Sequence, residues 1–261
     1  MALLALLLLP VCSDDRGLET GDGLLEEQTC FDFSDYLHTV SLVESTGRVV
    51  AVHHDDGMAY LAQGAHGLKI VDLTDPVSPA FRGGLGALQT ALDVFFQDGF
   101  AYVTLGSEGV AVVDVGDPDQ PSVVGHIGTP GNALGIVVSD TIAYVADDVV
   151  GLMLVGIGSP DKPRALGVDN SPGRAVDAAV SGAFAYVADE VNGLRVVNVN
   201  NPADPWLSNT VPLPGVAQGV AVAGGHAFVA AGTAGLQIVD VSTPGAEAVI
   251  GTMETRDRAL A

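Results

Sequence analysis

Short apolar runs separated by turn residues cover most of the chain. Between residues 133 and 168, four such runs follow one another at Ala133–Val138, Thr141–Ala146, Leu152–Ile157 and Arg164–Val168. They are rich in Val, Ile, Leu and Tyr, which favour β-strands. No window shows a sustained apolar period of about 3.6 residues. The pattern therefore predicts strands, lettered a to d in order within each unit, and almost no helix.

The same unit recurs at a fixed interval. A glycine precedes strand c of each unit, and each of these glycines lies 42 residues after the previous one: Gly67, Gly109, Gly151, Gly193 and Gly235. An Ala–Tyr or Ala–Phe pair in strand b and a proline in the c–d turn keep the same phase. A repeat of this length with four short strands is typical of a β-propeller, whose blades bury each other's faces. The sequence therefore predicts an all-β propeller with five complete blades, each of four antiparallel strands.

Both ends of the chain carry parts of a further unit. Residues His38–Ser45 are in phase with strand d at Ala80–Ala87, and Arg258–Ala261 are in phase with the start of strand a at Asn132–Gly135. In one interpretation, five blades close on themselves and leave spare terminal segments. In the other, a sixth blade combines the N-terminal strand d with C-terminal strands a, b and c, in a chain that stops before b and c. The end inside an apolar strand favours the second interpretation, whose open ring exposes strand edges that invite association.

The N-terminal segment predicts export from the cytoplasm. Residues 1–12 form an apolar stretch typical of a signal peptide, although no basic residue precedes Arg16. Leu8–Ser13 is similar to a bacterial lipoprotein box and makes Cys12 a candidate for lipidation, with an ordinary secretion signal and an incidental cysteine as the alternative. Residues 13–36 are acidic, which indicates a disordered tether, and residues 37–261 form the propeller. We expect a protein that is secreted or anchored by lipid at the cell envelope.

The net charge narrows the range of partners. Lys and Arg number 10 against 32 Asp and Glu, which gives a formal charge of −22. Nucleic acids and anionic membranes carry the same sign and are disfavoured, so membrane contact is expected only through a lipid anchor. Basic partners or cations are favoured, although acidic residues that merely solvate an apolar chain explain the charge without any partner.

Two segments around strand c resemble a known repeat. Gly67–Pro76 reads GLKIVDLTDP and Gly235–Pro244 reads GLQIVDVSTP, and both resemble the LVIVD repeat of bacterial and archaeal surface or secreted proteins. The YVAD segments at Tyr144–Asp147 and Tyr186–Asp189 are similar to the same family, and the resemblance spans residues 37–261. It implies a propeller and an extracytoplasmic location. It supplies no reaction and no catalytic residues.

Chain direction gathers several carboxylates at one end of the expected propeller axis. The b–c and d–a loops share one face of a propeller, and strand a lines its central channel. The candidate ligands for a divalent cation such as calcium, or for a cationic ligand, are Asp93 and Asp177 in strand a and Glu108, Asp147, Asp148, Asp189 and Glu190 in b–c loops. Oxygen ligands suit hard cations. The alternative is that these are solvated loop charges, since no Asp-x-Asp-x-Asp-Gly loop is present, and no other cofactor is expected.

No catalytic signature stands out. Gly-x-Ser-x-Gly, P-loop and His-Glu-x-x-His motifs are absent, so we assign no catalytic residues. We expect a scaffold that binds a protein or a glycan at the cell surface. The alternative is a hydrolase or lyase with an acidic site at the axial mouth, built on Asp93 and Asp177, and a third hypothesis is a purely structural envelope module. The single Trp206 begins a strand d, where we expect it to pack on a neighbouring blade; an exposed ring would instead indicate a contact surface.

Overall fold

The computed structural model describes residues 47–171 and 173–260. These residues form twenty strands in five four-stranded sheets, and no helix occurs among them. The predicted all-β architecture of five blades is confirmed. The expected signal peptide with Cys12, the acidic tether at residues 13–36 and the expected strand at His38–Ser45 lie outside the described residues.

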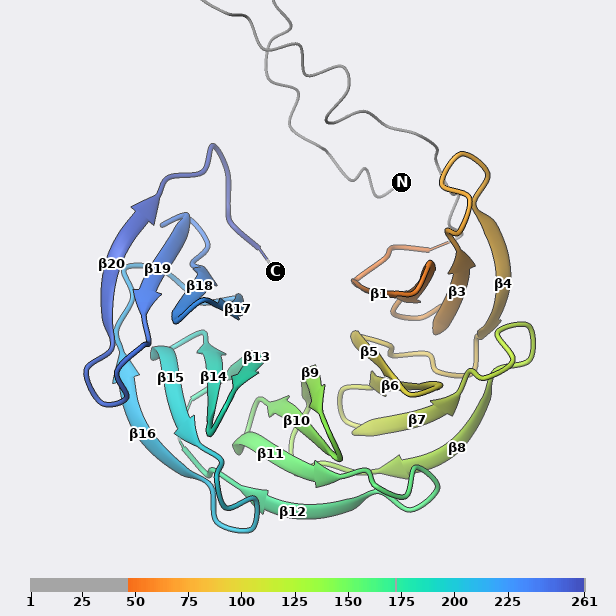
Figure 1. The fold of residues 1–261 in the computed structure, drawn as a ribbon, viewed down its shortest axis with the longest axis horizontal. Coiled ribbons are helices and arrows are strands. Elements are labelled where there is room, and N and C mark those ends of the chain that lie inside the picture. Colours follow the sequence, from red (N-terminus) through yellow and green to blue (C-terminus); the bar gives the residue numbers. More distant parts are fainter. Residues whose placement is uncertain (1–46, 172, 261) are drawn as a thin grey trace, which may run out of the picture.

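Each sheet is one blade of four antiparallel strands that pair in chain order. The strands are, blade by blade, β1 (Ala51–Asp55), β2 (Met58–Ala62), β3 (Leu68–Asp72) and β4 (Ala80–Leu85); β5 (Asp93–Gln97), β6 (Phe100–Thr104), β7 (Val110–Asp114) and β8 (Ser122–Ile127); β9 (Ala133–Ser139), β10 (Ile142–Asp147), β11 (Gly151–Gly156) and β12 (Arg164–Val168); β13 (Ala175–Ser181), β14 (Phe184–Asp189), β15 (Gly193–Asn198) and β16 (Trp206–Val211); β17 (Gly219–Ala223), β18 (His226–Ala230), β19 (Leu236–Asp240) and β20 (Ala248–Met253). Strand a of each blade is innermost and strand d is outermost (Figure 1).

The glycine that defines the period has a backbone conformation that other residues rarely adopt. In all five repeats its φ is positive, between 73° and 91°. A Cβ added to Gly109 would lie 2.2 Å from the carbonyl oxygen of Ile127 in the adjacent strand d. Only glycine fits this combination of positive φ and close approach. The residue is therefore fixed in every blade, which makes the period visible in the sequence.

Neighbouring blades bury apolar side chains between them. We call the side of a blade that faces the next blade in chain order its following face, and the opposite side its preceding face. Tyr60, Leu68 and Ile70 on the following face of the first blade pack in one cluster with Val103 and Val113 of the second. Equivalent clusters lie at each of the next three junctions. Burial on both sides of each blade explains why strand c is apolar almost throughout.

A second contact joins the outer rims of the blades. In the first three blades a glycine of strand d, Gly83, Gly125 or Gly167, lies against the c–d turn of the next blade. A Cβ on these glycines would lie 2.4, 2.1 and 2.5 Å from the carbonyl oxygen of Pro118, Pro160 and Pro202. We call each such glycine a notch. This contact explains why glycine recurs at the same position of strand d in these blades.

The fourth junction replaces this contact with a polar one. Asn209 occupies the notch position of the fourth blade, and its Nδ2 donates a 2.6 Å hydrogen bond to Glu247 of the fifth blade. Glu247 stands where the other repeats have the second proline of the c–d turn. The two departures from the repeat therefore compensate each other across one interface.

The ring of blades is open. Figure 1 shows the first and fifth blades facing each other across an opening, so the five described blades do not close on themselves. Beyond β20, Ala259 forms an isolated antiparallel bridge with Gly232 of the fifth blade. The same kind of bridge forms at two junctions where strand a of the next blade begins, between Gly64 and Ala91 and between Gly106 and Ala133. The sequence match with the start of a strand a thus has a counterpart in the structure at Ala259.

Candidate functional site at the axial channel

Asp93 and Asp177 connect inner strands of consecutive blades. Asp93 lies at the start of β5, where its Oδ1 accepts a hydrogen bond from the Val94 amide and its Oδ2 accepts one from the Ile136 amide in β9, both 2.8 Å long. In β13, Asp177 accepts bonds of 2.8 Å from the amides of Ala178 and of Val220 in β17. Each carboxylate therefore satisfies an edge amide of the next blade, which strand pairing leaves without a partner.

The third blade, between the two aspartates, carries Gly135 at the same position, and the fifth blade carries Gly219. A Cβ on Gly135 would lie 2.7 Å from the carbonyl oxygen of Val176 and 2.9 Å from the Cα of Asp177. A side chain at position 135 would force the third and fourth blades apart. The close approach of the inner strands thus explains the glycine at position 135.

Both aspartates hold their protons more tightly than a solvated carboxylate does. Burial raises the pKa of Asp93 to about 7, and the Asp177 charge adds to this rise, whereas the Ile136 and Val94 amides oppose it. Burial also raises the pKa of Asp177. Perturbed carboxyl groups in a channel are a feature of acid–base sites, but structural groups show it too. Here the oxygens of both groups already accept hydrogen bonds from backbone amides.

Asp147 and Asp189 stabilise the b–c loops from within. Asp147 is fully buried; its Oδ1 accepts from the amides of Val149 and Val150, and its Oδ2 accepts a 2.9 Å bond from the Gly131 amide in the d–a loop. Asp189 lies at the matching position of the next blade. The side chains of both aspartates are buried, and their oxygens accept hydrogen bonds from loop amides.

Asp189 belongs to a buried ionic triad with Arg195 and Asp169. Arg195 Nη1 lies 2.9 Å from Asp189 Oδ2, and Nη2 lies 2.5 Å from Asp169 Oδ2, with all three side chains exposed by 1% or less. Arg195 Nη1 also donates to the Ser171 carbonyl oxygen at 3.2 Å. Although burial raises the pKa of Asp189, hydrogen bonds from Asn192 and Val191 and the Arg195 charge bring it below its usual value. The triad ties the d–a loop to strand c.

The sequence analysis did not identify this triad, because neither Arg195 nor Asp169 recurs at its position in the other repeats. The position of Arg195 holds Lys69, Ala111, Met153 and Gln237 in the other repeats, so no period marks it. An isolated cation inside an otherwise apolar strand is the one signal that could have pointed to it.

The remaining predicted acids lie in loops at the surface. Asp148 accepts bonds of 2.7 and 2.8 Å from the backbone amide and side chain of Asn132, and Glu190 pairs with Arg174. Glu108 is exposed. Within residues 47–171 and 173–260, no three His, Cys, Asp or Glu side chains come together as metal ligands. Binding of a divalent cation stays a prediction.

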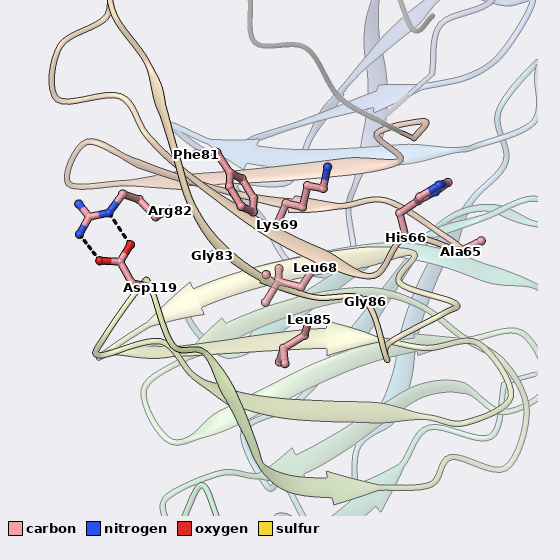
Figure 2. A pocket seen from close by; sticks show the side chains of 11 residues that line it. Ala65, His66, Leu68, Lys69, Phe81, Arg82, Gly83, Leu85, Gly86 and Asp119 are labelled. Carbon is pink, nitrogen blue, oxygen red and sulfur yellow. Dashed lines mark hydrogen bonds and ion pairs between the residues drawn. The ribbon is translucent and has the colours of Figure 1, made fainter.

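Two features of the outer surface could contact a partner. Trp206 at the start of β16 is 54% exposed and its neighbour Leu207 is 38% exposed. The expectation that Trp206 packs on a neighbouring blade is therefore wrong, since more than half of its side chain is exposed. An open groove of about 640 Å³ lies over β4 in the first blade. Figure 2 shows Lys69 and Phe81 in this groove beside the Arg82–Asp119 ion pair.

Comparison with known families agrees with the repeat seen in the fold. The LVIVD repeat matches residues 47–85, 90–129, 130–167, 172–212 and 214–255. The chain belongs to the LVIVD-repeat family. Each matched segment covers one blade of this LVIVD-repeat protein, from the start of strand a or just before it to the end of strand d. No curated protein matches the chain.

Solved structures share the fold of this LVIVD-repeat protein at low sequence identity. A functionally unknown protein from Desulfotomaculum acetoxidans aligns with a TM-score of 0.68 and 15% identity, over 84% of this chain and 75% of that one. The computationally designed Ika8 protein aligns with a TM-score of 0.63 and 11% identity, over 85% of this chain and 66% of that one. A chain of a nidogen/laminin complex aligns with a TM-score of 0.61 and 14% identity, over 81% and 82%. These likenesses show the fold alone.

Among the residues that the structure describes, no helix has the length and apolar character needed to cross a bilayer.

Proposed function

We propose that this LVIVD-repeat protein is an extracytoplasmic binding scaffold that holds a protein or glycan partner at the cell surface. The observation that carries the proposal is the exposed Trp206–Leu207 pair on the outer rim of the fourth blade. Exposed aromatic rings supply a large apolar surface at low entropic cost, and tryptophan is enriched among the residues that dominate binding energy. The same ring can stack on the apolar face of a sugar.

The geometry of the carboxylates supports binding rather than catalysis. Asp147 and Asp189 are occupied by loop amides and by Arg195, and Asp93 and Asp177 by amides of the next blade. The first pair stabilises the b–c loops, and the second pair holds consecutive blades together. Binding at the rim leaves this network undisturbed.

The relatives and the sequence support the setting of this function. A chain with a similar fold occurs in a nidogen/laminin complex, so the architecture is compatible with protein recognition. The LVIVD resemblance and the apolar start of the chain support export, with Cys12 as the residue that would carry a lipid. Mass spectrometry of the N-terminal peptide from expressing cells tests the last point, since lipidation adds acyl mass to Cys12.

The single tryptophan makes the proposal directly testable. Its fluorescence reports on Trp206 alone, because the full chain contains no other tryptophan. We expect a cell-wall glycan fraction or a purified envelope protein to shift the emission to shorter wavelength, as the ring leaves water. We expect Trp206→Ala to weaken binding of the same material by about tenfold or more.

Val123→Ala is the matched control, since Val123 is an exposed apolar residue on strand d of the second blade, outside both surface features. It should leave binding unchanged. If no envelope glycan or protein perturbs Trp206, or if Trp206→Ala binds as well as the unmodified protein, the proposal fails.

A second candidate function, a hydrolase or lyase acting at the axial mouth, is favoured by one observation. Burial raises the pKa of Asp93 to about 7, a value suited to general acid–base chemistry. If Asp93 served this role, any glycosidase, esterase or lyase activity of the purified chain would disappear in Asp93→Asn. Activity that survives in Asp93→Asn would exclude it.

A further inference from the structure

The following face of the fifth blade has no described blade against it. In the first four blades the strand b aromatic on this face is buried, with 6% exposure or less for Tyr60, Tyr102, Tyr144 and Tyr186. Its counterpart Phe228 is only half-buried, as are Leu236 and Ile238 in β19. Ile250 and Met253 of β20 are more than half exposed on the same blade.

This face nevertheless keeps the residues that receive a blade elsewhere. Phe228, Leu236 and Ile238 stand at the positions of Tyr60, Leu68 and Ile70, which pack against the second blade. An exposed surface that did not bind another element would be expected to carry polar residues at such positions. The apolar pattern is thus kept on a face that no other described blade covers.

The notch is also retained in the fifth blade. Gly251 occupies the position of Gly83, Gly125 and Gly167. A Cβ on Gly251 would meet nothing nearer than the Ile238 side chain at 3.5 Å, whereas the other three would collide with a proline turn. Among the described residues, nothing therefore fills the place for a Pro-x-x-Pro turn on the fifth blade.

The chain itself already begins the contact. Ala259 and Gly232 exchange two backbone hydrogen bonds, of 3.1 and 2.9 Å. The pairs Gly64–Ala91 and Gly106–Ala133 do the same at junctions where a complete blade follows. Residues 258–260 therefore lie where the first strand of a following blade starts, in continuity with an established interface.

From these four observations, we propose that the following face of the fifth blade is a docking site for a β-hairpin of the protein's own repeat type. The occupant supplies strands b and c of a blade, with apolar side chains toward Phe228, Leu236 and Ile238, and a Pro-x-x-Pro turn that enters the Gly251 notch. Addition of strands to an unfilled sheet position is an established mode of peptide recognition.

A peptide of residues 99–121 is the probe. It contains β6, β7 and the turn Pro118–Pro121. In the second blade its Val103 and Val113 pack on Leu68 and Ile70, the equivalents of Leu236 and Ile238. We expect the fluorescently labelled peptide to bind the full chain, to raise its melting temperature and to slow amide exchange in β19. A peptide with Val103→Asp and Val113→Asp is the negative control.

Three variants of the protein make the test specific to this face. Ile238→Asp and Gly251→Ala should each weaken peptide binding by about tenfold or more, the first by placing a charge in the interface and the second by filling the notch. Val249→Asp should bind normally, because Val249 pairs with Val239 and shares its side of the sheet, toward the fourth blade. Gly251→Ala should remain as stable as the unmodified protein, so a loss of binding there cannot arise from unfolding.

Absence of peptide binding would overturn the proposal. So would equal binding to all three variants, which would indicate a non-specific apolar contact. Sedimentation of the full chain as a dimer that Ile238→Asp dissociates would also overturn it, because a second copy would then be the occupant.

Discussion

At the scale of single residues, the phase of the repeat locates some candidates and hides others. Asp93 and Asp177 could be picked out because they share one position in alternate repeats, and the structure places both on inner strands. What the sequence could not show is that their oxygens hold amides of the next blade, because that contact depends on how blades approach. Arg195 carries no phase signal at all. Its importance follows only from burial beside Asp169 and Asp189.

Removal of the Arg195 charge should strongly destabilise the fold. Arg195→Met leaves two buried carboxylates without their cation, and methionine fits because Met153 occupies the same position in the third blade. We expect the free energy of unfolding in urea to fall by about 3–5 kcal/mol. A loss below about 1 kcal/mol, the size typical of a surface ion pair, would show that the triad is not buried as described.

Asp93 should make stability depend on pH in one direction. Its pKa is raised from 3.8 to about 7 in the folded state, so between these values the folded chain keeps a proton that the unfolded chain has released. The unfolded state then binds fewer protons, and stability falls as pH rises. The contribution of Asp93 is fully present below pH 3.8 and is lost by about pH 7.

The comparison with Asp93→Asn isolates this contribution from the other acids. Melting temperatures of the two proteins, measured from pH 4 to 8, should differ progressively up to about pH 7 and then run parallel. Phe96→Leu, a change in the same strand without a titratable group, serves as the control. Parallel curves for Asp93→Asn over the whole range would contradict the raised pKa.

At the scale of the elements, the sequence predicts more than it does for side chains. Strands β9 to β12 were expected within one residue of their observed ends, since the apolar runs and turn residues mark them directly. The turns confirm the local chemistry: Asp98 and Gly99 both have positive φ, as a tight hairpin turn requires. The contact of a strand d glycine with the next c–d turn could not be foreseen, because nothing local in strand d indicates what lies against it.

The same substitution at two notches should have opposite consequences. Gly125→Ala introduces a Cβ 2.1 Å from the Pro160 carbonyl oxygen, and the second and third blades must move apart. We expect a loss of about 1–3 kcal/mol in the free energy of unfolding. Gly251→Ala meets only ordinary contacts and should change stability little. Neither glycine has a positive φ, so backbone strain does not enter the comparison. Equal losses would argue against the rim contact.

At the scale of the whole molecule, the five described blades form an open ring (Figure 1). The period alone predicted the number of complete blades but left closure undecided, because both interpretations use the same repeats. The Gly232–Ala259 bridge and the half-buried Phe228 support the proposal that a further hairpin docks on the fifth blade. The formal charge of −22 opposes close approach of a second copy of the whole chain.

Amide hydrogen exchange tests the open fifth blade most directly. Strand c is hydrogen-bonded on both sides in every blade, so differences in protection among β7, β11, β15 and β19 report how well the blade faces are covered. Measured on the full chain without added peptide, β19 should exchange faster than the other three. Protection of β19 equal to that of β15 would contradict the account, since it would mean that the following face of the fifth blade is already covered.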